Sequence, residues 1–136
     1  MKKALASPKV AKTKGPYVQG VAVSDGTLIY TSGVVARDVN GKIRGKGDVA
    51  AQTRQCLRNI ENIIRAGGGR LRDLVKGTVF IRDLRDYTAM NEVRRAVLAD
   101  IPFASSTVQA QLNAPEALVE IEAVAFVSNS NGGGKK

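Results

Sequence analysis

The 136-residue sequence contains no histidine and no tryptophan, and Cys56 is its one cysteine. Without histidine the chain lacks the commonest general base and the commonest metal ligand. A single cysteine excludes an internal disulfide and a zinc site built from cysteines. The acidic residues also lack the spacing of a metal site, so we expect no metal. Any catalysis must then use carboxylate, tyrosine or hydroxyl groups, the backbone or water.

Long apolar runs are absent as well, so the sequence predicts no membrane-spanning segment. Met1-Lys2-Lys3 is followed by only three apolar residues before Ser7-Pro8, which is too few for a signal peptide. We therefore expect a cytoplasmic protein without membrane association. Its length is that of one ordinary domain.

Acidic residues are few, with 12 Asp and Glu against 21 Lys and Arg. Seven of the basic residues lie in 1–14 and 129–136, which leaves 14 basic against 12 acidic residues in between. We expect two flexible, solvated tails, 1–14 and 129–136, around one domain at 15–128. Because aromatic residues are scarce and no recognition motif is present, we predict no specific nucleic-acid surface.

Turn signals divide the first half of the domain. Strands at 17–24 and 27–32 flank Asp25-Gly26, which predicts a tight hairpin. Asp48 is a suitable N-cap for an amphipathic helix that ends at Gly67-Gly68-Gly69. Cys56 falls on the inner face of this helix, where we interpret it as a small buried hydrophobe.

The second half contains a strand at 74–82, an amphipathic helix that ends before Pro102, and strands at 104–112 and 117–128 that we expect to pair antiparallel. The last strand alternates strictly. One face carries an apolar row, Val119, Ile121, Ala123, Ala125 and Val127, and the other carries Glu120, Glu122, Val124 and Phe126.

These patterns predict an α+β fold, in which two helices cover one face of a mixed sheet of four to six strands. Both helices are needed to cover the sheet face that carries the Val119 row. Val124 and Phe126 lie on the opposite face, so we predict that another subunit covers that face. Glu120 would then lie near a subunit interface, where a cleft could form.

Several polar residues are candidates to surround Glu120. They are Tyr17, Ser32, Asn91 and the run Ser105, Ser106 and Thr107. Each also has an ordinary structural interpretation, as a packing ring, a turn hydroxyl, a surface residue or strand filler. Spacing alone favours these ordinary interpretations.

Six segments, in chain order, nevertheless form a recognisable set: Gly15-Pro16-Tyr17-Val18-Gln19-Gly20, Thr31-Ser32-Gly33, Gln52-Thr53-Arg54-Gln55 with Asn59-Ile60, Val75-Lys76-Gly77-Thr78-Val79-Phe80, Asn91-Glu92-Val93, and Val119-Glu120-Ile121-Glu122-Ala123-Val124-Ala125. Over about residues 7–127 they resemble the signature segments of the RidA/YjgF family of reactive-intermediate deaminases.

The resemblance implies a chorismate-mutase-like α+β fold, assembled as a homotrimer with clefts between subunits. It also implies cofactor-independent hydrolysis of small enamines and imines, such as 2-aminoacrylate or 2-iminopropanoate, to 2-keto acids and ammonia. The glutamate that matches Glu120 orients or activates the attacking water in that family, and the residues that match Tyr17, Ser32 and Asn91 line the same cleft. A family arginine at the start of the penultimate strand clamps the substrate carboxylate.

This chain departs from the family pattern at that clamp. Ser105 stands in the position of the arginine, Thr107 in that of a frequent cysteine, and Arg94 in that of a usual tyrosine. A serine hydroxyl cannot replace a bidentate guanidinium, so we expect a substrate with less need for the clamp. Arg94 or Arg95 could replace the family arginine as the clamp. Neighbouring helix positions point about 100° apart, however, so at most one of these two arginines faces the cleft.

Two hypotheses follow for the function. In the first, the chain is a divergent deaminase-like hydrolase of a small enamine, imine or related nitrogen metabolite, with Glu120, Tyr17 and Ser105 in catalysis and Ser32, Asn91, Thr107 and Arg94 in substrate binding. In the second, it is a trimer that has lost catalysis and binds a metabolite or a protein. An RNA-directed activity is not supported, because the chain has no histidine to act as a base and the domain between the two tails is not strongly basic.

Overall fold

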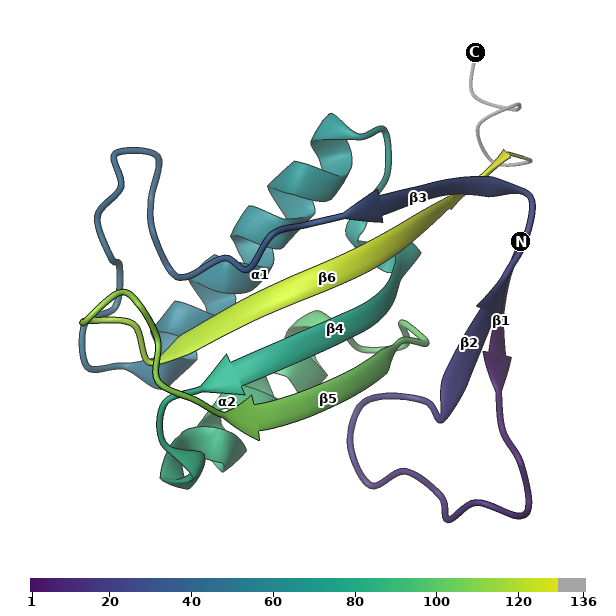
Figure 1. Cartoon of the computed structure of the whole chain (residues 1–136), viewed down its shortest axis with the longest axis horizontal. Coiled ribbons are helices and arrows are strands. Elements are labelled where there is room, and N and C mark those ends of the chain that lie inside the picture. The colour runs from purple at the N-terminus through teal and green to yellow at the C-terminus, as the bar shows by residue number, and fades with distance from the viewer. Residues whose placement is uncertain (130–136) are drawn as a thin grey trace.

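The computed structural model describes residues 1–129 as three strands, a helix, a strand, a helix and two strands (Figure 1). The strands are β1 Lys2–Leu5, β2 Gly20–Val23, β3 Gly26–Tyr30, β4 Leu74–Ile81, β5 Ala104–Gln109 and β6 Val119–Ser128, and the helices are α1 Val49–Ala66 and α2 Tyr87–Val97. Short 3-10 turns at Leu71–Asp73 and Leu84–Asp86 precede β4 and α2. No helix within residues 1–129 is long and apolar enough to cross a membrane.

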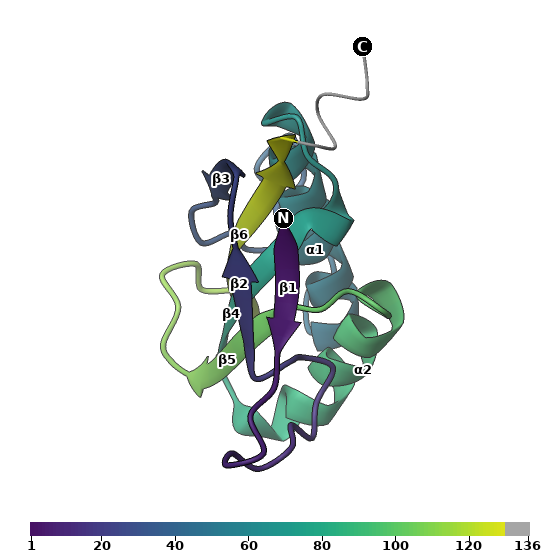
Figure 2. The same cartoon turned by 90° about the vertical axis from the view of Figure 1, so that its right-hand side faces the viewer.

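Four strands form the main sheet in the order β3-β6-β4-β5. β6 runs antiparallel to both β3 and β4, while β4 and β5 are parallel. Both helices lie on one side of this sheet (Figure 2). This arrangement confirms the predicted mixed sheet with two helices on one face.

Helix α1 forms where capping and periodicity predicted it. The Asp48 carboxylate accepts a hydrogen bond from the Ala51 amide, and Gly67 ends the helix. Its buried residues include Cys56, Leu57 and Ile60, which pack with Val119 and Ile121 of β6. The predicted apolar row of the last strand therefore faces the helices, as expected.

Two predicted strand pairings are wrong. β5 does not pair with β6, because β4 lies between them in the sheet. The expected hairpin between 17–24 and 27–32 is also absent, because β2 pairs with β1 and β3 pairs with β6. Asp25, in the short link between β2 and β3, has a φ of 68°, and β1 and β2 form a separate two-stranded ribbon beside the main sheet (Figure 1).

Strand β1 lies in the segment that the sequence predicted as a structureless tail. The Lys2 ammonium donates hydrogen bonds to the carbonyls of Arg72 and Leu74, at 2.7 and 3.0 Å, which ties the ribbon to the start of β4. The expected C-terminal tail, 129–136, lies outside the described residues except for Asn129.

The second face of the sheet is not covered by the helices. It carries Leu28, Tyr30 and Val108, which are 43%, 70% and 44% exposed. Phe126, which we expected to require another subunit, is already buried within the chain, and its ring lies against Gly26. This open face therefore carries exposed apolar residues that the sequence did not single out, beside Val124, which is half-buried on the same face.

Candidate active site

Five polar or aromatic side chains meet where α2 crosses the start of β5. We name this group the arginine half-site, and its members are Tyr17, Tyr87, Asn91, Arg94 and Ser105. Tyr87, Asn91 and Arg94 come from successive turns of α2, while Ser105 pairs with Gly77 on the face of the sheet that the helices cover. Tyr17 is brought to the same place by the Val18 amide, which donates to the Phe103 carbonyl at 2.8 Å.

Arg94 is the centre of this half-site. Its Nη1 donates to Ser105 Oγ at 2.6 Å, and its Nε and Nη2 both donate to Asn91 Oδ1, at 3.2 and 2.7 Å. These three bonds fix the guanidinium plane between the helix and the strand. Arg95, its neighbour in sequence, is exposed, so only one of the two arginines points inward.

The guanidinium is a buried charge without an acidic partner. Arg94 is 2% exposed and is the one charged residue buried within residues 1–129. No ion pair among these residues includes it. Burial lowers the pKa of Arg94 from its ordinary value, whereas the neighbouring Tyr87 and Tyr17 raise it. The site is therefore a fixed positive charge held by neutral groups.

A surface hollow of about 380 Å³ lies against the start of α2. Three members of the arginine half-site line it, Tyr17, Tyr87 and Asn91, but Arg94 itself does not. Its charged lining residues are Lys14, Glu92 and Arg95, two cations and one carboxylate. The hollow has room for a small organic molecule.

Glu120 lies elsewhere, in a second group that we name the glutamate half-site: Ser32, Gly33 and Glu120. The chain after β3 continues along β6, where the Val34 amide donates to the Ile121 carbonyl at 2.8 Å and the Ile121 amide donates to the Val34 carbonyl at 2.9 Å. Glu120 is half-buried and its carboxylate lies against the Gly33 backbone, so closely that a β-carbon at Gly33 would collide with Oε2. Ser32 is exposed next to it.

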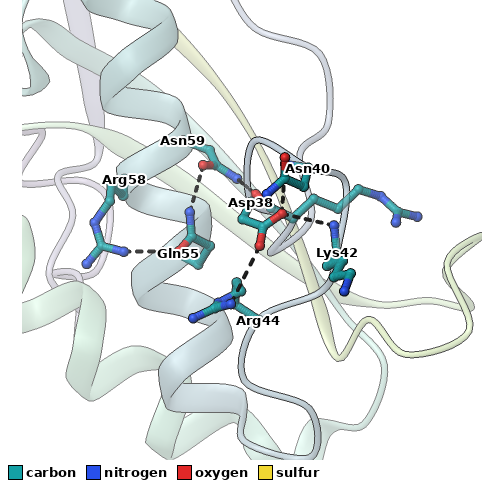
Figure 3. A network of polar contacts seen from close by, with 8 residues as sticks. Asp38, Asn40, Lys42, Arg44, Gln55, Arg58 and Asn59 are labelled. Atoms are coloured by element: carbon teal, nitrogen blue, oxygen red, sulfur yellow. Dashed lines mark hydrogen bonds and ion pairs between the residues drawn. The ribbon is translucent and has the colours of Figure 1, made fainter.

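The segment that follows Gly33 is held against α1 by a polar network (Figure 3). Asn59 Nδ2 donates to the carbonyls of Val35 and Arg37, at 3.2 and 2.9 Å, and Gln55 Nε2 donates to Asn59 Oδ1 at 2.9 Å. Asp38 closes the turn by accepting from the amides of Asn40 and Lys42. This network fixes the backbone against which the Glu120 carboxylate lies.

Cys56 is completely buried on α1, behind the glutamate half-site, as the sequence predicted. Its thiol lies 3.5 Å from the Val34 carbonyl oxygen. Burial, with a smaller contribution from the Glu120 charge, raises the pKa of Cys56 to about 12. The thiol is therefore neutral and sealed from solvent, which does not suit a nucleophile.

The two half-sites of one chain do not meet. Ser105 is level with Gly77 and Ala123 on the helix-covered face, whereas Glu120 pairs with Phe80 on the open face. Two strand spacings separate Ser105 from Glu120 sideways by about 10 Å, and three residues along β6 add about 10 Å lengthwise. Thr107 is half-buried further along β5, on the same face as Ser105.

Comparison with known proteins decides the family. The family model described as Endoribonuclease L-PSP matches residues 7–127. This chain belongs to that family, the RidA/YjgF family. The 2-iminobutanoate/2-iminopropanoate deaminase of Escherichia coli strain K12 is 39% identical over 130 residues, which cover 92% of this chain and 98% of that protein.

Solved structures of RidA/YjgF proteins show the same fold. The Rid-family protein YyfB of Yersinia pestis superposes with a TM-score of 0.83 at 25% identity, covering 93% of this chain and 98% of that one. TdcF of E. coli, solved with bound serine, superposes with a TM-score of 0.67 at 34% identity, covering 93% and 99%.

Two residues of the candidate site were not singled out by sequence reasoning. Tyr87 lies one helical turn before Asn91, a spacing that places both on one face of α2 and could have been used to find it. Gly33 was part of a matched segment, but only the structure shows its contact with Glu120. Within residues 1–129 no group of three His, Cys, Asp or Glu side chains is arranged to hold a metal.

Proposed function

We propose that this chain is a cofactor-independent deaminase that hydrolyses a small imine or enamine, with Glu120 as the group that orients and deprotonates water. The observation that carries the proposal is the half-buried Glu120 carboxylate, seated against Gly33 on the open face of the sheet. Relatives in the family are named as imine deaminases, which supports the same reaction class here.

Glu120 would act as a proton shuttle in this reaction. Water adds to the carbon of the C=N bond while Glu120 accepts one water proton and passes it to nitrogen, which gives a carbinolamine. The remaining hydroxyl proton then moves to nitrogen by the same route, the C–N bond breaks, and ammonia leaves with the bonding electrons. The water oxygen becomes the ketone oxygen, and Glu120 returns to its starting form.

The positions of the two half-sites favour an active site shared between subunits. One chain holds Glu120 and Arg94 on different faces of its sheet, so a complete site would need the glutamate half-site of one copy and the arginine half-site of another. We propose a homotrimer, the assembly implied by the family resemblance. The exposed apolar residues Leu28, Tyr30 and Val108 support association through the open face.

The direct test is hydrolysis of 2-iminobutanoate, generated in situ from threonine by a pyridoxal-phosphate dehydratase, with 2-oxobutanoate release followed over time. We expect the chain to accelerate release and Glu120→Gln to reduce the rate by about 100-fold or more, because an amide cannot accept the proton. Glu122→Gln, an exposed neighbour on the same strand face, is the matched control and should retain activity. An unchanged rate in Glu120→Gln would refute the proposed role.

A further inference from the structure

A basic surface on the β1–β2 ribbon carries an inference that does not depend on the proposed function. The surface consists of Lys3, Leu5, Lys9, Val10 and Lys12, and we name it the lysine arm. We infer that the lysine arm docks on the surface of an anionic lipid bilayer. This reverses our expectation from the sequence of a flexible, solvated tail without membrane association.

The distribution of charges along the chain is the first argument. Residues 1–24 contain five lysines, no arginine and no acidic residue, whereas residues 25–128 contain 11 arginines, three lysines and all 12 acidic residues. The planar fork of arginine suits defined, paired contacts, while the lysine ammonium acts as a strongly hydrated point charge. A cluster made of lysine alone therefore fits a diffuse anionic surface better than a single carboxylate or phosphate.

The order of this segment is the second argument. Gln19 holds the loop between β1 and β2: its Oε1 accepts from the Ser7 amide at 2.7 Å, and its Nε2 donates to the Val10 and Ala11 carbonyls, both at 3.2 Å. The Val10 amide also donates to the Ser7 carbonyl at 3.1 Å, so Lys9 and Val10 lie on a fixed turn. The conformational entropy of these residues is therefore already lost before a partner binds.

The lysine arm points away from the body of the protein. Lys2 faces the main sheet, where it is bonded to two carbonyls, so alternation along β1 turns Lys3 and Leu5 to the outer face of the ribbon. The ribbon forms the side of the molecule that faces the viewer in Figure 2. Leu5 is 44% and Val10 56% exposed. The three lysines of the arm are exposed as well, and no ion pair within residues 1–129 includes any of them.

The two other lysines of residues 1–24 have neighbouring acidic groups and are not part of the arm. Burial lowers the pKa of Lys2, and the nearby charge of Asp73 opposes that shift. Lys14 lines the hollow beside α2 together with Glu92. The uncompensated charge is therefore that of the lysine arm itself.

The mixture of ammonium and aliphatic groups identifies the partner. Leu5 follows Lys3 by two residues, and Val10 lies between Lys9 and Lys12. At a bilayer interface such ammonium groups meet the lipid headgroups while the aliphatic side chains enter the boundary of the acyl chains. A single-stranded nucleic acid would instead require aromatic side chains for stacking, and residues 1–16 contain none. The partner is therefore a bilayer that contains acidic phospholipids.

The test is cosedimentation of the full-length protein with vesicles of phosphatidylcholine, with and without about one-third phosphatidylserine. We expect binding to the anionic vesicles only, and a loss of about 100-fold in the triple variant Lys3→Gln, Lys9→Gln, Lys12→Gln, which corresponds to about fivefold per lysine. Val10→Ser should lower binding by about threefold even at high salt, because an apolar contact is not screened. The matched control removes three exposed charges elsewhere, Lys42→Gln, Arg54→Gln and Arg58→Gln, and should bind within about twofold of the native chain.

Three results would overturn the inference. The first is equal binding of the native protein to both kinds of vesicle, and the second is native-like binding by the triple variant, whose folding is checked by thermal unfolding. The third is preferential binding, at equal concentration of negative charge, to a single-stranded oligonucleotide or to polyglutamate, which would assign the lysine arm to another polyanion. Because no substituted residue belongs to either half-site, 2-iminobutanoate hydrolysis by the triple variant tests the proposed function separately.

Discussion

At the scale of single residues, the side chains of Arg94 and Glu120 are each held in place by their neighbours. Arg94 is held by Asn91 and Ser105, so the direction of its guanidinium is fixed. Glu120 is held by the close approach of Gly33, which leaves its carboxylate no room to turn toward that side. Both groups are thus preorganised, which is the condition for a fixed charge to favour a transition state.

Gly33→Ala tests the position of the Glu120 carboxylate. The new methyl group would overlap Oε2, and the flexible glutamate side chain should move rather than the backbone. We expect a change in unfolding free energy of at most about 1 kcal/mol but a loss of about 10-fold or more in deaminase rate. Gly20→Ala is the control, because a methyl group there meets only the Leu5 side chain at ordinary contact distance. Equal rates for Gly33→Ala and the native chain would show that this contact has no functional role.

Cys56 makes a separate prediction at the same scale. Because burial raises its pKa to about 12, the native thiol should resist thiol reagents at pH 8 and react fully after unfolding. The unfolded thiol loses its proton near pH 9.0 and the folded one only near 12, so stability should fall as pH rises between these values, by up to about 1.4 kcal/mol per pH unit. In Cys56→Ala this contribution should disappear. Rapid labelling of the folded protein would contradict the buried, neutral thiol.

At the scale of elements, the structure depends on how the segment after β3 is tied to α1. Asn59 links α1 to Val35 and Arg37, and the same segment supplies Gly33 to the glutamate half-site (Figure 3). The helix therefore supports the site without contributing a side chain to it. Loosening this link should affect activity through the position of the backbone.

Asn59→Ala tests that link. Loss of two side-chain hydrogen bonds should lower the unfolding free energy by about 1 to 2 kcal/mol and speed amide exchange across residues 33–44. Arg58→Ala, which loses only a bond to Gln55, should leave exchange in this segment unchanged. Native-like exchange in Asn59→Ala would show that the segment is held by other contacts.

The sequence predicted individual helices and strand faces better than it predicted which strands pair. The alternation of side chains predicted which row of β6 is buried, and Asp48 and Gly67 predicted the two ends of α1, because each of these signals is local in the sequence. The pairings of β2 and β5 were mispredicted because neighbours in sequence need not be neighbours in a sheet, and nothing local places β4 beside β6. Helical spacing showed that only one of Arg94 and Arg95 points inward, but the choice depends on the rotation of α2 against β5, which the sequence does not contain.

At the scale of the whole molecule, the proposed active site would need more than one copy of the chain. The arginine half-site lies at the β5 edge on the helix-covered face, and Glu120 lies two strands away on the open face. Neither half-site alone brings a cation and a carboxylate to one substrate. Subunit assembly would then be a condition for activity as well as for stability.

Mixing two inactive variants tests this central claim most directly. Glu120→Gln and Arg94→Gln chains would be refolded together in equal amounts, and 2-iminobutanoate hydrolysis measured against each variant alone. If every site takes Glu120 from one subunit and Arg94 from its neighbour, about a quarter of the sites in randomly mixed oligomers contain both intact residues. We therefore predict recovery of about a quarter of native activity. A mixture no more active than its two components would contradict a site shared between subunits.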